Sequence, residues 1–255
     1  ISFYLGLGFS NIGKVEEARK YYQSGIDLAL LHQIRTPLTG LCINLGGLYY
    51  LQGNFQKGEE YSKLAISYLE SSPDDLYLAV SLSVLAPCLY KLQNFTEALS
   101  TSQKAEGLFQ KLNDRIQTLI TQIRIEKYIY NLPDLPNLQS VSQKIQNIEI
   151  EMNKIQDSED KAGLLEEFAS YSVLMKNTDK ARLNYKNAMD LCRKYSDRTL
   201  LGTILYDLGI IEYDQGNFTE SKALLQEAYE IYKDIQNPER IRRMESILEY
   251  NLHQN

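Results

Sequence analysis

Apolar residues recur along this chain every three or four positions, the spacing that places side chains on one face of a helix. The stretch 218–232 shows the pattern clearly, with apolar or small residues at Phe218, Ser221, Leu224, Leu225, Ala228, Ile231 and Tyr232. No alternating pattern of a length typical of strands competes with it. The sequence therefore predicts an all-α protein.

The turns between the predicted helices are repeated. Gly53-Asn54-Phe55 recurs as Gln93-Asn94-Phe95 and as Gly216-Asn217-Phe218, with degenerate forms at 13–15 and 176–178. We call the third residue of each turn the turn marker. The markers stand at 15, 55, 95, 178 and 218, so the period is 40 residues with one double gap. A fixed period of this length is the signature of a helical repeat array.

The double gap holds one more unit if Leu138 is its turn marker. Its usual turn is replaced by the segment 131–136, which contains Pro133 and Pro136, and we expect an altered helix angle there. A helix at 237–252 follows the last unit and is interpreted as a cap, although it could instead begin a seventh unit. The predicted units are therefore about 1–35, 36–73, 74–113, 114–157, 158–197 and 198–236 within one domain, 1–255, closed by this capping helix.

Small residues occupy fixed places in the units. The residue nine before the marker is small in five units, at Gly6, Gly46, Ala86, Ala169 and Gly209. The residue ten after it is Gly25, Ala65, Ala105, Ile148, Ala188 or Ala228. Because a larger side chain would overpack the contact, these positions predict a close approach of the two helices of each unit.

The segment from Leu45-Gly46 through Tyr49, Gly53, Phe55 and Gly58 to Ala65 resembles the tetratricopeptide repeat signature, and 208–228 matches it again. The family's common tryptophan is absent, and the period exceeds the usual 34 or so. The resemblance implies a right-handed α-solenoid, or superhelix, with a concave groove lined by the first helix of each unit. Similar long-period repeats occur in kinesin light chains, bacterial peptide-pheromone receptors and bacterial regulators with nucleotide-binding domains.

Composition narrows the function further. The formal charge of −6 argues against nucleic acid as a direct partner, since binding phosphates needs a basic footprint. The basic cluster Arg240, Arg242 and Arg243 is interpreted as a solvated helix face. No apolar run approaches the roughly 20 residues of a membrane-spanning helix.

Three widely spaced cysteines predict reduced thiols and a cytoplasmic protein. Because the chain starts at Ile1, we expect it to be a fragment of a longer protein.

Residues for catalysis are missing. The chain has two histidines and neither a phosphate-binding glycine loop nor a zinc-protease motif. Adjacent acidic pairs such as Glu166-Glu167 point about 100° apart on a helix, which suits acid–base chemistry poorly. We expect no enzyme activity, no cofactor and no metal.

The resemblance also implies which residues line the groove. Five residues before the marker stand Tyr50, Tyr90 and Tyr213, and Tyr130 keeps the same register. Neighbouring candidates for contact with a peptide or partner are Asn11, Lys91, Lys127, Asn131 and Tyr206. Tyrosine offers a large contact area and a polar hydroxyl. The alternative is that these rings only fill space between helices.

Three functions remain open. The first is a non-catalytic scaffold that binds a peptide or protein segment in the groove. The second is the sensing domain of a bacterial regulator that binds a signalling peptide. The third is a regulatory appendage of an enzyme whose catalytic domain lies outside this chain.

Overall fold

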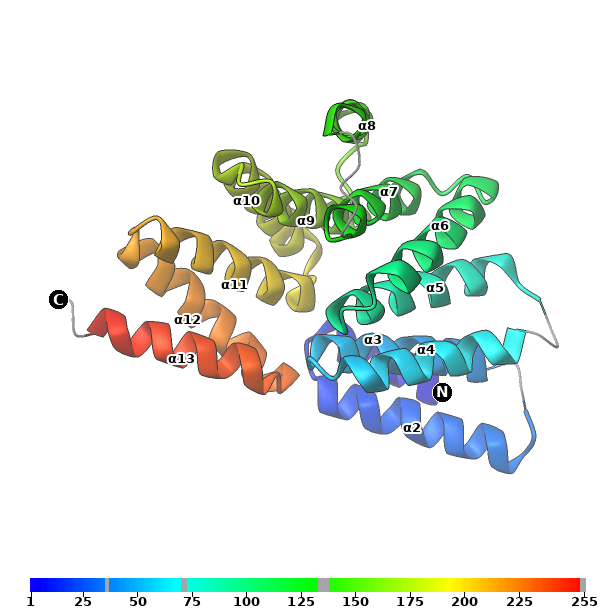
Figure 1. The fold of residues 1–255 in the computed structure, drawn as a ribbon. Helices are drawn as coiled ribbons and strands as arrows, with labels where there is room; N and C mark the ends of the chain where they lie inside the picture. The colour runs from blue at the N-terminus through cyan, green and yellow to red at the C-terminus, as the bar shows by residue number, and fades with distance from the viewer. Residues whose placement is uncertain (35–36, 70–72, 133–137, 253–255) are drawn as a thin grey trace. The chain divides into compact units, whose positions relative to one another are not determined.

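A computed structural model describes the chain in four segments, with side chains except at 138–142 and 250–252: residues 1–34, 37–69, 73–132 and 138–252. The parts described are helices and short turns, with no strand among them. The helices are α1 (Ser2–Asn11), α2 (Val15–Leu31), α3 (Leu38–Leu51), α4 (Phe55–Leu69), α5 (Asp75–Lys91), α6 (Phe95–Lys111), α7 (Arg115–Tyr130), α8 (Leu138–Asn153), α9 (Glu159–Leu174), α10 (Thr178–Tyr195), α11 (Arg198–Asp214), α12 (Phe218–Ile235) and α13 (Pro238–Leu252) (Figure 1). The predicted all-α class is confirmed.

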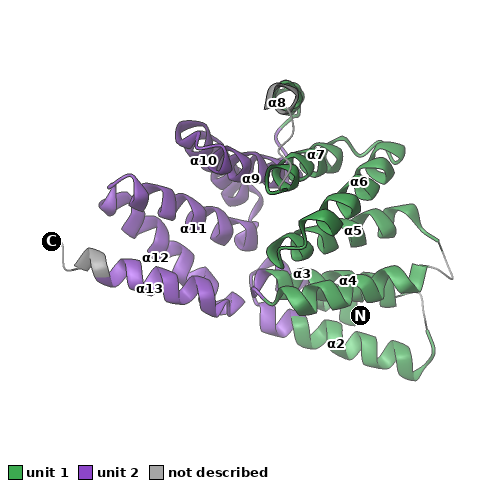
Figure 2. Ribbon diagram, viewed as in Figure 1, with its two compact units in different colours: residues 1–6, 19–50, 54–156 green, residues 7–18, 51–53, 157–255 purple. Residues whose placement is uncertain are grey.

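The chain divides into two compact units, coloured separately in Figure 2. Unit 1 comprises residues 1–6, 19–50 and 54–156, and unit 2 comprises residues 7–18, 51–53 and 157–255. Within unit 1, α4 packs against α5, α5 against α6 and α6 against α7. Within unit 2, the helices from α9 to α13 pack in the same consecutive manner. The boundaries of the six repeats and their assignment to one domain stay predictions.

Each repeated turn follows one backbone plan. The residue two before the marker adopts a left-handed conformation, with φ of 77° at Gly53 and 79° at Gly216. Gln93 takes the same conformation with φ of 63°, although a side chain there is strained. The next residue closes the preceding helix, as in the 2.8 Å bond from the Asn54 amide to the Tyr49 carbonyl oxygen. Asn54 also caps α4 by accepting a 3.2 Å bond from the Lys57 amide, whereas the side chains of Asn94 and Asn217 make no such capping bond. The predicted segment 131–136 cannot be compared, since 133–136 lie outside the described residues.

The small residues do bring the paired helices close together. A Cβ added at Gly46 in α3 would lie 3.0 Å from the Ser62 hydroxyl of α4, and one at Gly209 in α11 would lie 2.7 Å from Leu225 of α12. The Ser221 hydroxyl donates a 2.8 Å bond to the Gly209 carbonyl oxygen across the second contact. These positions leave no room for a larger residue, as the sequence predicts.

None of the helices in the described part of the chain combines the length and the apolar character that crossing a bilayer requires.

Candidate functional site

Three of the predicted groove tyrosines share one packing arrangement. Each is half-buried, and its ring contacts the phenylalanine that serves as the turn marker of the same repeat. The ring centroids are 5.6 Å apart for Tyr50–Phe55, 5.4 Å for Tyr90–Phe95 and 5.6 Å for Tyr213–Phe218. Packing therefore occupies part of the surface of each ring, which supports the space-filling alternative for that part.

Tyr90 gathers two further predicted residues around it. The Asn131 amide donates a 3.1 Å bond to the Tyr90 hydroxyl and a 2.8 Å bond to the Lys127 carbonyl oxygen. The Lys127 ammonium lies 5.9 Å from the centroid of the Tyr90 ring, within the range of a cation–π interaction. The Tyr128 ring stacks on Tyr90 at 4.7 Å. We call Tyr90, Lys127, Tyr128 and Asn131 the Tyr90 cluster.

The cluster is held by the ends of two helices of unit 1. Tyr90 stands in the last turn of α5, and Asn131 is the C-terminal cap of α7. Tyr128 is fully packed, with 1% exposed, whereas Tyr90, Lys127 and Asn131 are all half-buried. The cluster therefore consists of one buried ring, that of Tyr128, and three half-buried side chains that carry a phenol, an amide and an ammonium group.

The other predicted residues lie in different places. In unit 1, Lys91 is exposed at the end of α5 and Tyr130 is half-buried at the end of α7. In unit 2, Asn11 is exposed at the end of α1, and Tyr206 belongs to α11. The predicted residues are thus divided between the two units, and the structure brings Tyr90, Lys127 and Asn131 together.

Tyr206 is the most buried of the nine, with 7% exposed. The Arg240 guanidinium of α13 lies 4.7 Å from the Tyr206 ring centroid and 5.2 Å from that of Tyr232. Burial raises the pKa of Tyr206, and the positive charges of Arg243 and Arg240 partly oppose this rise. Arg240 therefore departs from the predicted solvated face, whereas Arg242 and Arg243 are exposed as expected.

The residue before Tyr213 forms a buried ion pair. Glu212 is 0% exposed and accepts a 2.5 Å bond from Nε of Arg182 and a 3.0 Å bond from Nη2. Asn217 donates a further 2.6 Å bond to this carboxylate. Burial raises the pKa of Glu212, but the bonds from Arg182 and Asn217 outweigh it and leave the pKa below its ordinary value. This pair joins α10 to α11 and is structural.

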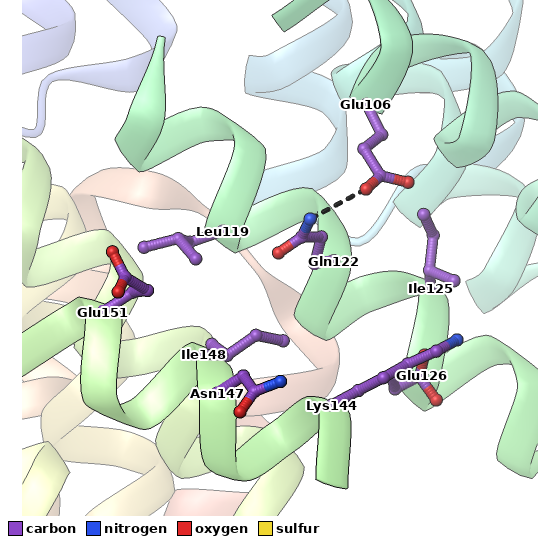
Figure 3. Close-up of a pocket in the computed structure, with 9 residues that line it drawn as sticks. All are labelled: Glu106, Leu119, Gln122, Ile125, Glu126, Lys144, Asn147, Ile148 and Glu151. Atoms are coloured by element: carbon purple, nitrogen blue, oxygen red, sulfur yellow. Dashed lines mark hydrogen bonds and ion pairs between the residues drawn. The ribbon is translucent and has the colours of Figure 1, made fainter. Parts of the chain in front are cut away.

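A cleft in unit 1 was missed by the sequence reasoning. It lies between α7 and α8, has a volume of about 310 Å³ and is also bordered by Glu106 of α6. Figure 3 shows side chains of α7 and α8 facing one another across it. Its most buried charged group is Glu126, 3% exposed. The signal was available, because Glu126 lies 40 residues after Ala86 and 80 after Gly46, where those units carry a small residue.

No metal centre is evident in the segments that the structure describes, where no three His, Cys, Asp or Glu side chains lie close enough to share an ion. Cys42, Cys88 and Cys192 are buried free thiols, and burial raises the pKa of each to about 12. Such thiols are poor nucleophiles, since the thiolate is the reactive form.

A family model described as "Tetratricopeptide repeat" matches residues 38–123 and 160–234, more than half of the chain. The chain belongs to the tetratricopeptide repeat family. The match leaves out 1–37, 124–159 and 235–255, and the second of these stretches contains Glu126 and α8. The tetratricopeptide fold inferred from the turns is confirmed.

Solved structures show the same helical-repeat fold. A Rap protein in complex with Competence and Sporulation Factor is 9% identical with a TM-score of 0.64, covering 99% of this chain and 85% of that one. A tetratricopeptide protein of Thermus thermophilus is 17% identical with a TM-score of 0.57, covering 82% and 98%. A signal transduction ATPase of Pyrococcus horikoshii with a tetratricopeptide repeat sensor is 18% identical with a TM-score of 0.55, covering 93% of this chain.

The chain spans 35% of the length of the Pyrococcus ATPase, so it corresponds to only part of that protein. Among curated protein sequences, none matches this chain. At these identities the likeness to solved structures concerns the fold alone.

Proposed function

We propose that this tetratricopeptide chain is a non-catalytic scaffold that binds a peptide or an extended segment of a partner protein. The observation that carries the proposal is the Tyr90 cluster, in which a phenol, an amide and an ammonium group are partly exposed at adjoining helix ends. The Asn131 amide oxygen can accept a hydrogen bond from a peptide N–H, and the Tyr90 hydroxyl can donate one to a peptide carbonyl oxygen. Rigid aromatic rings supply contact area with little loss of conformational entropy.

The cluster is organised before any ligand arrives. Asn131 is held by two hydrogen bonds, and Tyr90 is fixed between the rings of Phe95 and Tyr128. Since ordering side chains on binding costs free energy, a preformed surface of this kind favours association.

The sensing function remains the second candidate. It is supported by the fold shared with a Rap protein in complex with Competence and Sporulation Factor and with the tetratricopeptide sensor of an ATPase. A helix-turn-helix domain or a nucleotide-binding domain joined to this chain would mark a regulator. The cytoplasmic location also stays a prediction.

The test is selection of binders from a displayed library of random peptides, followed by titration of the selected peptides. Tyr90→Phe combined with Lys127→Gln removes the hydroxyl and the cation but keeps the packing. We expect this variant to weaken binding about tenfold, or about 1.4 kcal/mol. Tyr77→Phe is the matched control, since Tyr77 is a 43% exposed tyrosine on the same helix.

Selected peptides that bind the double variant and the wild type equally would show that the Tyr90 cluster only packs. Tyr130→Ala tests the next member of the register in the same assay, and we expect it to weaken binding as well.

A further inference from the structure

The fourth repeat lacks the small residue that lets the two helices of other repeats approach closely. Counting in steps of 40, Glu126 of α7 takes the place of Gly46 and Ala86. At Gly46 even a Cβ would lie 3.0 Å from the Ser62 hydroxyl and 3.2 Å from the Gly58 carbonyl oxygen of the paired helix. A glutamate at the same place therefore forces the second helix of the repeat away from the first.

The second helix of this repeat carries a matching change. Ile148 of α8 stands where Ala65, Ala105, Ala188 and Ala228 stand in other units. Glu126 and Ile148 both line the cleft of about 310 Å³, so the two enlarged residues act as spacers on its opposite walls. Helix α8 packs far less extensively on α7 than α6 packs on α5 in the preceding repeat, and Figure 1 shows α8 standing away from α7.

The cleft holds a buried carboxylate that is only half satisfied. Oε1 of Glu126 pairs with the Lys144 ammonium at 2.9 Å. Oε2 has no hydrogen-bond partner among the side chains that the structure describes, although the Glu126 side chain is only 3% exposed. A buried charged oxygen without a partner is costly, which makes this oxygen a candidate for a cation from outside the chain.

The rest of the lining adds negative charge without balancing it. Glu106 accepts bonds of 3.0 Å from Gln110 and 2.8 Å from Gln122, and both donors are neutral amides that end on Oε1. Glu151, by contrast, is paired with Lys154 and Arg115, and their bonds lower its pKa. Glu106 and Glu126 therefore place two negative charges in the cleft, and Lys144 supplies one positive charge against them.

Leu119, Ile125 and Ile148 give the cleft an apolar part, beside the amides of Gln122 and Asn147, as Figure 3 shows. A volume of about 310 Å³ stands at the lower end of the range for small-ligand pockets. A metal ion suits this cleft poorly, because no three acidic groups among the described residues lie close enough to share one. An organic cation on an aliphatic chain suits it well, since the chain would contact the isoleucines while its head reaches the carboxylates.

We propose that the cleft between α7 and α8 binds an alkylammonium or alkylguanidinium group that pairs with Oε2 of Glu126. Such a group occurs on a lysine or arginine side chain of a partner and on a free aliphatic amine. The cleft is distinct from the Tyr90 cluster, so failure of one proposal leaves the other standing.

The test is a titration followed by methyl NMR, with Ile125 and Ile148 as reporters inside the cleft and Ile204 as a buried reporter in unit 2. The probes are capped tripeptides with a central lysine, arginine or norleucine, together with free 1,6-diaminohexane. We expect the cationic probes to shift the two cleft methyls in a saturable manner and the norleucine peptide to leave them unchanged. A diamine that binds more tightly than the lysine peptide would identify a free amine as the ligand, and the reverse order would identify a partner side chain.

Glu126→Gln keeps the size of the side chain and removes its charge. We expect it to weaken binding of the cationic probes about tenfold, whereas Glu60→Gln, an exposed control on α4, leaves binding unchanged. Lys144→Met removes the resident cation and is expected to tighten binding about threefold. Equal binding by wild type and Glu126→Gln, equal binding of the norleucine peptide, or looser binding by Lys144→Met would each overturn the proposal. Unchanged helical circular dichroism and an unchanged methyl signal of Ile43, which is buried in unit 1 outside the cleft, establish that the fold of each variant is intact.

Discussion

Removal of Arg182 tests how the second unit is held together. Arg182 is the cationic partner that the structure gives Glu212, whose side chain is 0% exposed, and it reaches that carboxylate through two hydrogen bonds of 2.5 and 3.0 Å. Arg182→Met keeps the aliphatic stem of the side chain and removes the charge. Asn217 remains, but its neutral amide cannot balance the carboxylate.

The expected loss of stability follows from the Glu212 carboxylate, which stays buried when Arg182 is replaced. Breaking a buried pair by removing one partner leaves an uncompensated buried charge and costs about 3–5 kcal/mol. Arg193→Met on the same helix is the matched control, because the Arg193–Glu227 pair has side chains that are 47% and 44% exposed. Exposed pairs contribute about 0–1 kcal/mol, so the control is expected to be nearly silent.

The assay is urea unfolding followed by helical circular dichroism, with hydrogen exchange of α10 to α12 as a local readout. Local exchange is needed because repeat arrays open in segments, so a single global free energy is not always defined. Adding Glu212→Gln to Arg182→Met removes the buried charge and is expected to recover at least about half of the loss. Equal losses for Arg182→Met and Arg193→Met, or no recovery in the double variant, would refute the reasoning.

The pH dependence of this pair has a defined sign. The folded pKa of Glu212 lies below its ordinary value of 4.5, so the pair contributes stability above pH 4.5 and loses it as the pH falls through the folded pKa. The difference in stability between wild type and Arg182→Met should therefore shrink in acid.

Two further predictions concern packing and thiol chemistry. Gly209→Val should destabilise the protein by about 1–3 kcal/mol in urea unfolding, because its Cβ would lie 2.7 Å from Leu225. Gly47→Ala should stabilise α3 by about 0.5–1 kcal/mol, because a Cβ there has no neighbour within 4 Å. Equal effects of the two substitutions on stability would contradict the packing account. A thiol-specific reagent at neutral pH should label Cys88 only as fast as the protein opens, since burial raises the pKa of this thiol from 9.0 to about 12. Because the folded pKa is the higher one, the contribution of Cys88 to stability is complete below pH 9.0 and is lost as the pH rises towards 12, which denaturant titrations at alkaline pH would measure.

The sequence was sufficient to predict the fold because the signals for it are local. A left-handed residue, an asparagine before the helix and a phenylalanine recur at 53–55, 93–95 and 216–218, and small residues mark the helix contacts. These constraints act on the backbone within one repeat and need no knowledge of distant partners.

The candidate site was predicted less completely, because side-chain contacts between repeats depend on tertiary packing. The register placed Tyr90 and Asn131 in neighbouring units but did not reveal the hydrogen bond between them. It also placed Arg240 on a solvated face, whereas α13 packs so that this guanidinium covers Tyr206. In the sequence, Glu126 was recognisable only as an exception to the pattern of small residues. Its burial depends on the distance between α7 and α8, which the sequence does not give.

The exception at Glu126 also affects the dynamics of the repeat array. In an array, each helix pair is stabilised mainly by its nearest neighbours. The loosely packed junction between α7 and α8 is therefore where unit 1 opens at the lowest free energy, and backbone amides of α8 should exchange with solvent before those of α5 and α6. Closing this junction around a cation would slow that exchange, so occupancy of a small cleft would be reported by the motion of an entire helix.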